Sequence, residues 1–497
     1  MDELTPRPAT ALCDAALADL ATEVSVPTYD RARLTPGIVH IGVGNFHRAH
    51  QAWYLHRLMQ AGLALDWAIL GAGVRAGDAA MRDRLLAQDC LTTLIELRPD
   101  GRSAEITGSI TGFLPVEPDN AALVAAIADP ATRIVSLTVT EGGYFTNPAT
   151  GAFDAAHPDM TYDAAHPDAP RSAFGAIVAG LARRRAAEAG PLTVQSCDNL
   201  QGNGEVTRRT VTGLARLIDA DLADWIDDAC SFPNSMVDCI VPATGAAEIA
   251  AARAFGIDDR APVTHENFRQ WVIEDDFCAG RPPWEEVGVT FTARVHDYEA
   301  MKIRILNAGH QVLANAGELL SCDTIADCMA DPRIAAFFAR VESEGIVPYV
   351  APVPGMTPQA YAELIARRFA NPAIRDTTRR VAFDGSSRHT GFILPILRDA
   401  LAAGGDIRGL ALVEALWARM CEGTREDGSV IEPNDPVWDR LTAAAHAARA
   451  RPMAWLEQGG IYGDLAQNDR FADAFSDWLT MIHRLGVAAT LKAYTQA

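Results

Sequence analysis

The amino-acid sequence predicts an α/β fold with a parallel sheet, followed by a mostly α-helical domain. Short apolar runs alternate with helical patterns up to about residue 290, which is typical of a parallel sheet covered on both faces. From about residue 300 helical spacing dominates and strand-like runs become rare. We expect the boundary near residues 285–298, just after Pro282 and Pro283, and therefore expect domains at 1–290 and 291–497.

Apolar runs and helical spacing place the individual elements. The predicted strands of the first domain are residues 38–41, 67–70, 133–140 and 192–196, and its clearest helices are 120–128 and 172–187. In the second domain, helical spacing predicts helices at 299–319, 333–343, 358–370, 393–403, 410–421, 436–449 and 471–484.

Composition excludes several classes of partner. The formal charge of −21 argues against nucleic acid or anionic membrane, because both attract basic surfaces. No run approaches the 18 or so apolar residues of a membrane span, and the acidic start does not resemble a secretory signal. The nine cysteines are scattered without a CxxC pair, which indicates reduced thiols in the cytoplasm and no structural zinc site.

A glycine pair follows the first predicted strand. Gly42-x-Gly44 between a strand and a helix matches the start of a dinucleotide fingerprint, although His47 stands where a third glycine is usual. We therefore expect a Rossmann-type nucleotide-binding domain. Asp78 is the best candidate for the ribose-binding acid because it follows the second strand, whereas Arg75 would suit a 2′-phosphate. NAD is the expected cofactor, with NADP as the alternative.

The segment YEAMKIRILNAGHQ, residues 298–311, holds the main catalytic candidates. At about 100° per residue, Glu299, Lys302, Asn307 and His310 share one side of an α-helix within an arc of about 140°. A lysine beside a core suggests a cleft and a tuned proton affinity, and ligand clefts tend to form at domain boundaries. The alternative is an amphipathic helix whose polar stripe faces water.

Six motifs, taken in order, carry a family resemblance. GVGNFHRAHQAWY, SLTVTEGGY, SCDNLQGNG, FPNSMVDCIVPAT, FRQWVIEDDF and MKIRILNAGHQ resemble the polyol-specific long-chain dehydrogenases, or mannitol dehydrogenase family, along nearly the whole chain. The Lys-x4-Asn-x2-His signature is its most specific element. The resemblance implies a fold of a Rossmann domain followed by a helical domain.

The resemblance also implies roles for single residues. Lys302 matches the general base, Asn307 and His310 its companions, Asn199 a second amide that binds the reacting oxygen, and Glu299 a group that passes the proton to water. Asp238 and Arg380 match substrate-contacting positions, and Arg388 and His389 are further candidates near Arg380. Gly42, Gly44, Asn45, Phe46 and Asp78 are the expected cofactor-binding set.

The expected reaction is hydride transfer between a polyol and NAD, with D-mannitol and D-fructose as the expected pair. An alcohol-oxidising base should have a pKa near the working pH, and burial near a positively charged nicotinamide would lower that of a lysine. No metal is expected, and the resemblance implies a monomer. Alternatives are reduction of a keto-hexuronate, for which Arg380 or Arg388 would bind the carboxylate, and a nucleotide sensor without catalysis.

One competing motif lies in the same segment. Tyr298-x3-Lys302 has the spacing of the Tyr-x3-Lys pair in short-chain dehydrogenases, where the tyrosine is the base. In short-chain dehydrogenases the pair lies inside the nucleotide-binding domain, whereas in this chain Tyr298 and Lys302 follow that domain. We therefore expect Lys302 to be the base and Tyr298 to be dispensable.

Overall fold

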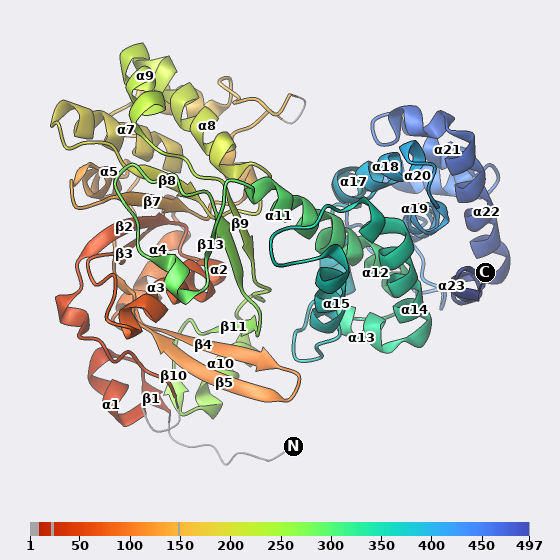
Figure 1. The fold of residues 1–497 in the computed structure, drawn as a ribbon, viewed down its shortest axis with the longest axis horizontal. Helices are drawn as coiled ribbons and strands as arrows, with labels where there is room; N and C mark the ends of the chain where they lie inside the picture. Colours follow the sequence, from red (N-terminus) through yellow and green to blue (C-terminus); the bar gives the residue numbers. More distant parts are fainter. Residues whose placement is uncertain (1–8, 21–23, 148–149, 497) are drawn as a thin grey trace. The chain divides into compact units, whose positions relative to one another are not determined.

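A computed structural model describes residues 9–20, 24–147 and 150–496, and divides the chain into two compact units, Met1–His296 and Asp297–Ala497 (Figure 1). This division falls a few residues after the expected domain boundary at 290. The first eight residues of the expected first domain lie outside the described residues.

A five-stranded parallel sheet forms the centre of the first unit. Its order is β6 (Ile110–Phe113), β3 (Ala68–Ala72), β2 (Pro36–Ile41), β7 (Ile134–Leu137) and β8 (Thr193–Ser196). The predicted strands at 38–41, 67–70, 133–140 and 192–196 correspond to four of these. The strand order reverses between β2 and β7, and ligands bind at such a switch point, outside the carboxyl ends of the strands. The expected Rossmann-type fold is confirmed.

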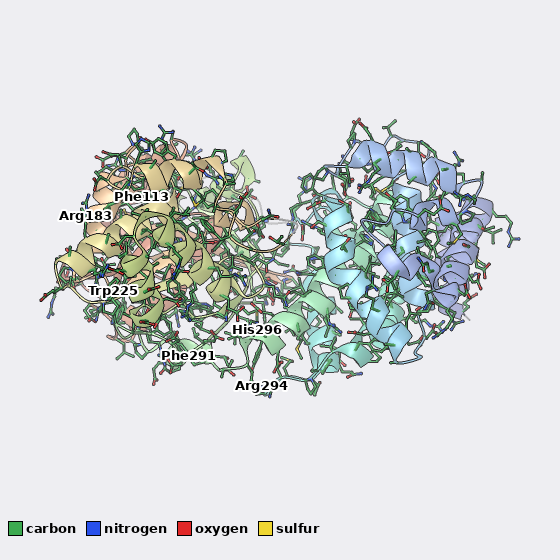
Figure 2. The ribbon with its side chains drawn as sticks, turned by 90° about the horizontal axis from the view of Figure 1, so that it is seen from above. Phe113, Arg183, Trp225, Phe291, Arg294 and His296 are labelled. Atoms are coloured by element: carbon green, nitrogen blue, oxygen red, sulfur yellow. The ribbon has the colours of Figure 1, made fainter. Side chains whose placement is uncertain are left out.

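Both faces of this sheet are covered, which explains why its strands read as continuous apolar runs. Val39 and Val135 point into a core with α5 (Ala121–Ala128), α7 (Ala173–Ala186) and α8 (Asn203–Ile218). Ile38 and Ile134, one residue earlier on the same strands, face the opposite core, which includes α3 (Gln51–Gln60). In Figure 2, Arg183 and Trp225 mark α7 and α9 (Ala220–Ala229).

Further strands of this unit were not predicted. The sequence reading missed the hairpin of β4 (Thr92–Arg98) and β5 (Gly101–Thr107), because β4 is buried on both faces and shows no alternation. The other added strands are β1 (Thr10–Ala11), β9 (Ser235–Asp238), β10 (Ile257–Asp258), β11 (Val263–Glu266), β12 (Gln270–Ile273) and β13 (Thr290–Phe291). The remaining helices are α1 (Leu17–Leu20), α2 (Asn45–Ala49), α4 (Asp78–Leu86), α6 (Pro158–Ala165) and α10 (Ala246–Ala254).

The second unit is helical in the part of the chain that the structure describes. Its α-helices are α11 (Val295–Met301, which begins two residues before the division), α12 (Ala308–Leu319), α13 (Ile325–Ala330), α14 (Pro332–Arg340), α15 (Pro358–Phe369), α16 (Thr378–Ala382), α17 (Gly385–Arg388), α18 (Leu394–Ala402), α19 (Arg408–Met420), α20 (Trp438–Ala448), α21 (Met453–Leu456), α22 (Asp469–Leu485) and α23 (Val487–Gln496). Six of the seven predicted helices correspond to α14, α15, α18, α19, α20 and α22, whereas the predicted helix 299–319 covers the end of α11, the π-helical segment Lys302–Asn307 and α12. Asp331 and Thr357 cap α14 and α15, each followed by a proline in the first turn.

Helix α12 is central to this unit and contacts α13, α14, α16 and α19. Three π-helical segments interrupt or join the α-helices: Lys302–Asn307, Val341–Ile346 and His389–Ile393. The first of them contacts the other two. π-Helical turns are rare, and those that occur are often found at functional sites. Their contact with one another here favours a functional site at the segment that holds the catalytic candidates.

Candidate active site

Gly42 directly follows β2 at the switch point of the sheet. Its φ of +97° is a conformation that side chains rarely adopt, and a Cβ atom there would lie 2.2 Å from the carbonyl oxygen of Thr138, just after β7. Its N–H donates to Ala72 O at 3.0 Å. Only glycine therefore fits in this turn after β2, where the end of β7 lies close beside it.

The local backbone does not explain the glycine at position 44. Its backbone is in an ordinary extended conformation, and an added Cβ would meet only Gly42 O, at 3.8 Å. The chain itself therefore does not require glycine here. A bare backbone in front of a helix fits the close approach of a dinucleotide pyrophosphate, so the residues present suit that cofactor.

The next two residues are engaged within the unit. The Asn45 amide donates to Pro242 O at 3.0 Å and to Thr244 Oγ1 at 2.9 Å. The Phe46 ring stacks on His50, with ring centroids 4.8 Å apart. A cofactor contact by Asn45 would therefore come from its backbone.

Asp78 orders the loop that follows β3. Its Oδ2 accepts the N–H groups of Val74 and Arg75 at 3.0 and 2.9 Å, and its Cβ would lie 2.3 Å from a Cβ at Gly73. One carboxylate oxygen thus holds the loop at the strand's carboxyl end. Its expected role as the ribose-binding acid stays a prediction.

A buried acid next to Asn199 fixes the loops after β7 and β8. Asp198 accepts the N–H groups of Val139 and Thr140, each at 2.9 Å, and the Tyr144 hydroxyl at 2.6 Å. Burial raises the pKa of Asp198, against the opposing effect of these donors. Thr140 has φ +68° and ψ 162°, a region otherwise used by glycine, and such strain concentrates at functional sites.

Two predicted site residues of the first unit lie at the ends of strands. Asn199 is exposed and follows Asp198 directly at the carboxyl end of β8. Asp238 is the last residue of β9 and is buried. Sequence reasoning missed Asp198, although the SCDNLQGNG motif contains it and an acid at a strand end was a usable signal.

The segment that carries Lys302 is a π-helix, and this corrects the expected geometry. In a π-helix each N–H bonds to the carbonyl five residues earlier, so Lys302 and Asn307 lie about one turn apart on the same side. The expected separation of about 140° between them, based on α-helical spacing, is wrong for this segment. The wider turn aligns the lysine with the amide.

Burial supports a catalytic interpretation of this segment over a solvated polar stripe. Lys302 is 8% exposed and Glu299 4% exposed, while Asn307 and His310 are half-buried. A surface stripe would expose these groups to water. Tyr298 is also buried, and its hydroxyl donates to Pro354 O at 3.3 Å.

His310 lies in an apolar and cationic environment. Its ring stacks on Phe369 with centroids 4.3 Å apart, and its Nε2 is 3.7 Å from Asp376 Oδ2. Burial lowers its pKa to about 4; Asp376 opposes this, and Arg380, Arg388 and Arg368 add to it. The imidazole is therefore neutral at pH 7 and offers one donor and one acceptor nitrogen.

Asp376 joins His310 to the predicted substrate-contacting arginine. Arg380 Nε and Nη2 donate to the two oxygens of Asp376 at 2.6 and 2.7 Å, a bidentate pair four residues apart in the chain. Asp376 is buried, whereas the Arg380 side chain is 61% exposed. Sequence reasoning missed Asp376, because nothing in the spacing distinguishes it from an ordinary surface pair.

His389, a further candidate, lies inside the helical unit. It is fully buried, with Nδ1 2.7 Å from Glu414 Oε1 and Nε2 3.0 Å from the Asn315 amide. All its hydrogen-bonding groups are thus used inside the helical unit. The expectation that His389 lies near the substrate stays a prediction, but both ring nitrogens are already bonded to protein side chains.

No group of three or more histidine, cysteine or acidic side chains is arranged to hold a metal ion in residues 9–20, 24–147 and 150–496. Within the same residues, no helix combines the length and apolar character needed to cross a membrane.

The fold and these side chains define a nucleotide-binding oxidoreductase architecture: a Rossmann unit and a helical unit with a buried lysine. Family descriptions agree with this. The Rossmann domain of mannitol dehydrogenase matches residues 36–286, and the mannitol dehydrogenase C-terminal domain matches residues 294–483. The chain belongs to the mannitol dehydrogenase family, which confirms the resemblance expected from the six motifs.

Individual relatives agree over nearly the whole chain. A mannitol 2-dehydrogenase of Cereibacter sphaeroides is 56% identical, covering 96% of this chain and 100% of the relative. The structure of Pseudomonas fluorescens mannitol 2-dehydrogenase in a ternary complex with NAD and D-mannitol is similar with a TM-score of 0.87 at 40% identity, covering 98% and 100% of the two chains. A substrate-free D-sorbitol dehydrogenase gives a TM-score of 0.89 at 35% identity, covering 97% and 100%.

Proposed function

We propose that this chain catalyses the NAD-dependent oxidation of D-mannitol to D-fructose and the reverse reduction, with Lys302 as the general base. Family membership and relatives that carry this activity in their names support the reaction. The observation that carries the lysine assignment is the burial of Lys302 in a π-helix, where Asn307 lies about one turn further on the same side.

Each residue has a role that follows from its chemistry. Lys302 takes the proton of the substrate hydroxyl, and Asn307 and Asn199 donate hydrogen bonds to the oxygen as it gains negative charge. His310 is neutral, so it orients a hydroxyl as donor or acceptor without adding charge. Glu299 passes the proton on to water. The nicotinamide, when bound, accepts the hydride, and no metal is required.

Other residues hold the cofactor and the rest of the polyol. Gly42 and Gly44 form the turn for the pyrophosphate, and Asp78 binds the adenosine ribose, which favours NAD over NADP. Asp238 and Arg380 bind substrate hydroxyls. The pairing of Arg380 with Asp376 leaves that arginine locally neutralised, which suits an uncharged polyol.

Two variants test the base. Lys302→Ala is expected to lower kcat at least about 1,000-fold, whereas Tyr298→Phe is expected to retain most activity, because Tyr298 bonds a backbone carbonyl. NAD reduction with D-mannitol measures both. A Lys302→Ala enzyme with near wild-type kcat would refute the assignment.

A keto-hexuronate reductase is the second candidate. The observation that favours it is the electrostatic influence of Arg368, Arg380 and Arg388 on His310, since guanidinium groups suit a carboxylate. A panel of polyols, ketoses and keto-hexuronates assayed with NAD and NADP separates the two. Activity on uronates alone would overturn the mannitol assignment, and an NADP preference would overturn the role of Asp78.

We further propose, first, that the enzyme is a monomer and, second, that it acts in the cytoplasm. Light scattering at the exit of a sizing column tests the first point, since one chain has a mass of 53.3 kDa. A mass near twice that value would contradict it.

A further inference from the structure

Arg48 lies fully buried in α2, one turn after the glycine pair. Its Nη2 donates to Asn45 Oδ1 at 2.8 Å, its Nε to Gly44 O at 3.3 Å, and its Nη1 to Ala261 O. None of these acceptors is a carboxylate, and within the described ranges no acid is close enough to form an ion pair with this guanidinium.

Asn45 extends this arrangement to a second segment. While its oxygen accepts from Arg48, its amide nitrogen donates to Pro242 O and Thr244 Oγ1. Thr244 Oγ1 in turn donates to Pro262 O at 2.7 Å. One guanidinium therefore ties together the glycine turn, residues 242–244 and residues 261–262.

Asp259, the acid that affects the pKa of Arg48, makes its hydrogen bonds to other groups. Asp259 favours the charged form of Arg48, but the Asp259 oxygens accept from the Gln88 amide, Ala261 N and Thr93 N at 2.7–2.8 Å. Asp259 thus orders the loop whose carbonyl faces Arg48. A buried cation held by neutral oxygens is a poor means of stabilisation, because its desolvation is only partly offset.

The geometry has a direct consequence for the turn. In a trans peptide the C=O and N–H groups point in opposite directions. The Gly44 carbonyl accepts both the backbone N–H and the Nε of Arg48, each at 3.3 Å, so the N–H of Asn45 points away from the buried guanidinium. The adjacent positive charge also favours an anion at the turn.

We propose that Arg48 is a positioning residue for the cofactor pyrophosphate: it fixes the Gly44–Asn45 peptide and the Asn45 side chain, and its buried charge favours anion binding at the turn. This inference rests on the proposed NAD-dependent function. It predicts a loss specific to ligands that contain the pyrophosphate, and not a general loss of folding.

Arg184 provides a matched control. It is also buried, and its guanidinium donates only to backbone carbonyls, those of Ile127, Asp129, Thr132, Ala189, Gly190 and Pro191. None of these residues belongs to the glycine turn. Replacing Arg184 therefore removes a comparable buried arginine without touching the proposed cofactor site.

The experiment measures binding of ADP-ribose and adenosine by isothermal titration calorimetry for wild type, Arg48→Met, Arg48→Lys and Arg184→Met. Arg48→Met is expected to weaken ADP-ribose binding about 30-fold and adenosine binding less than about twofold. Arg48→Lys keeps the charge but lacks the planar guanidinium group that bonds several acceptors at once, so ADP-ribose binding is expected to weaken about 10-fold. Arg184→Met should lower the thermal midpoint and leave both affinities within about twofold.

Kinetics provide a second readout. The KM for NAD should rise in Arg48→Lys with kcat nearly unchanged, because the reacting groups are untouched. Equal weakening of ADP-ribose and adenosine, or wild-type ADP-ribose affinity in Arg48→Met, would overturn the inference. If Arg48→Met does not fold, wild-type ADP-ribose affinity in Arg48→Lys overturns it equally. A wild-type protein that binds no ADP-ribose refutes the proposed function itself.

Discussion

Replacing Glu342 by glutamine is expected to stabilise the helical unit at neutral pH. Glu342 lies in the π-helix Val341–Ile346, is 3% exposed, and has no hydrogen-bond partner for either oxygen among the described residues. Its Oε1 would lie 2.6 Å from a Cβ at Gly309, next to His310, with Phe338 and Phe369 beside it. Burial alone raises its pKa well above the ordinary value of 4.5.

The magnitude follows from proton linkage. Above pH 4.5 the unfolded chain releases the Glu342 proton, whereas the native state keeps it. The contribution of Glu342 to stability is therefore fully present below pH 4.5 and is lost as the pH rises towards the native pKa. The stability lost is about 1.4 kcal/mol for each pH unit between the unfolded-state pKa and the raised native pKa. For a unit of this size, each kcal/mol corresponds to a midpoint shift of about 2–4 °C.

Scanning calorimetry of wild type and Glu342→Gln at pH 5, 6, 7 and 8 measures this difference. Glutamine does not titrate, so the advantage of the variant should be small at pH 5 and increase with pH. Glu414→Gln is the matched control, because Glu414 is equally buried but bonds His389 Nδ1 at 2.7 Å and the Tyr462 hydroxyl at 2.6 Å. That variant should lose about 1.5–3 kcal/mol.

Two outcomes would refute the reasoning about Glu342. An advantage of Glu342→Gln that is the same at pH 5 and pH 8 would mean that native Glu342 does not hold its proton. A variant less stable than wild type at pH 8 would mean that the carboxyl has a favourable partner.

Two further substitutions test the site. Gly42→Ala should weaken NADH binding more than 10-fold and lower stability by at least about 2 kcal/mol, because of its positive φ and the contact with Thr138 O; fluorescence titration and calorimetry measure these. Gly62→Ala, with φ +75° but open space around it, should lower stability by about 1 kcal/mol and leave NADH affinity unchanged, and an equal loss of affinity in both would contradict the assignment. Asp376→Asn removes the carboxylate that holds Arg380 and faces His310, so the KM for D-mannitol should rise about 10-fold with the KM for NAD unchanged. Unaltered kinetics with D-mannitol would exclude Asp376 from the site.

Much of the fold was predictable because it depends on local patterns. The runs that became β2, β3, β7 and β8 are apolar and bounded by turn residues, and the predicted helices show clear helical spacing. The hairpin β4–β5 was missed because a strand buried on both faces loses its alternation. The three π-helices were also missed, because one wide turn within a longer helical pattern is too short to be told from an α-helix by apolar spacing.

The candidate site shows the same division. The sequence by itself determined the family, the glycine turn at Gly42 and the lysine–asparagine–histidine order, because these depend on residue identity and short spacing. The folded structure was needed to show that Lys302–Asn307 is a π-helix, that His310 is neutral, that Asp376 lies beside His310, and that Arg48 bonds the glycine turn. Desolvation and charge pairing depend on groups far apart in the chain, such as Phe369 and Asp376 around His310, and folding alone brings these together.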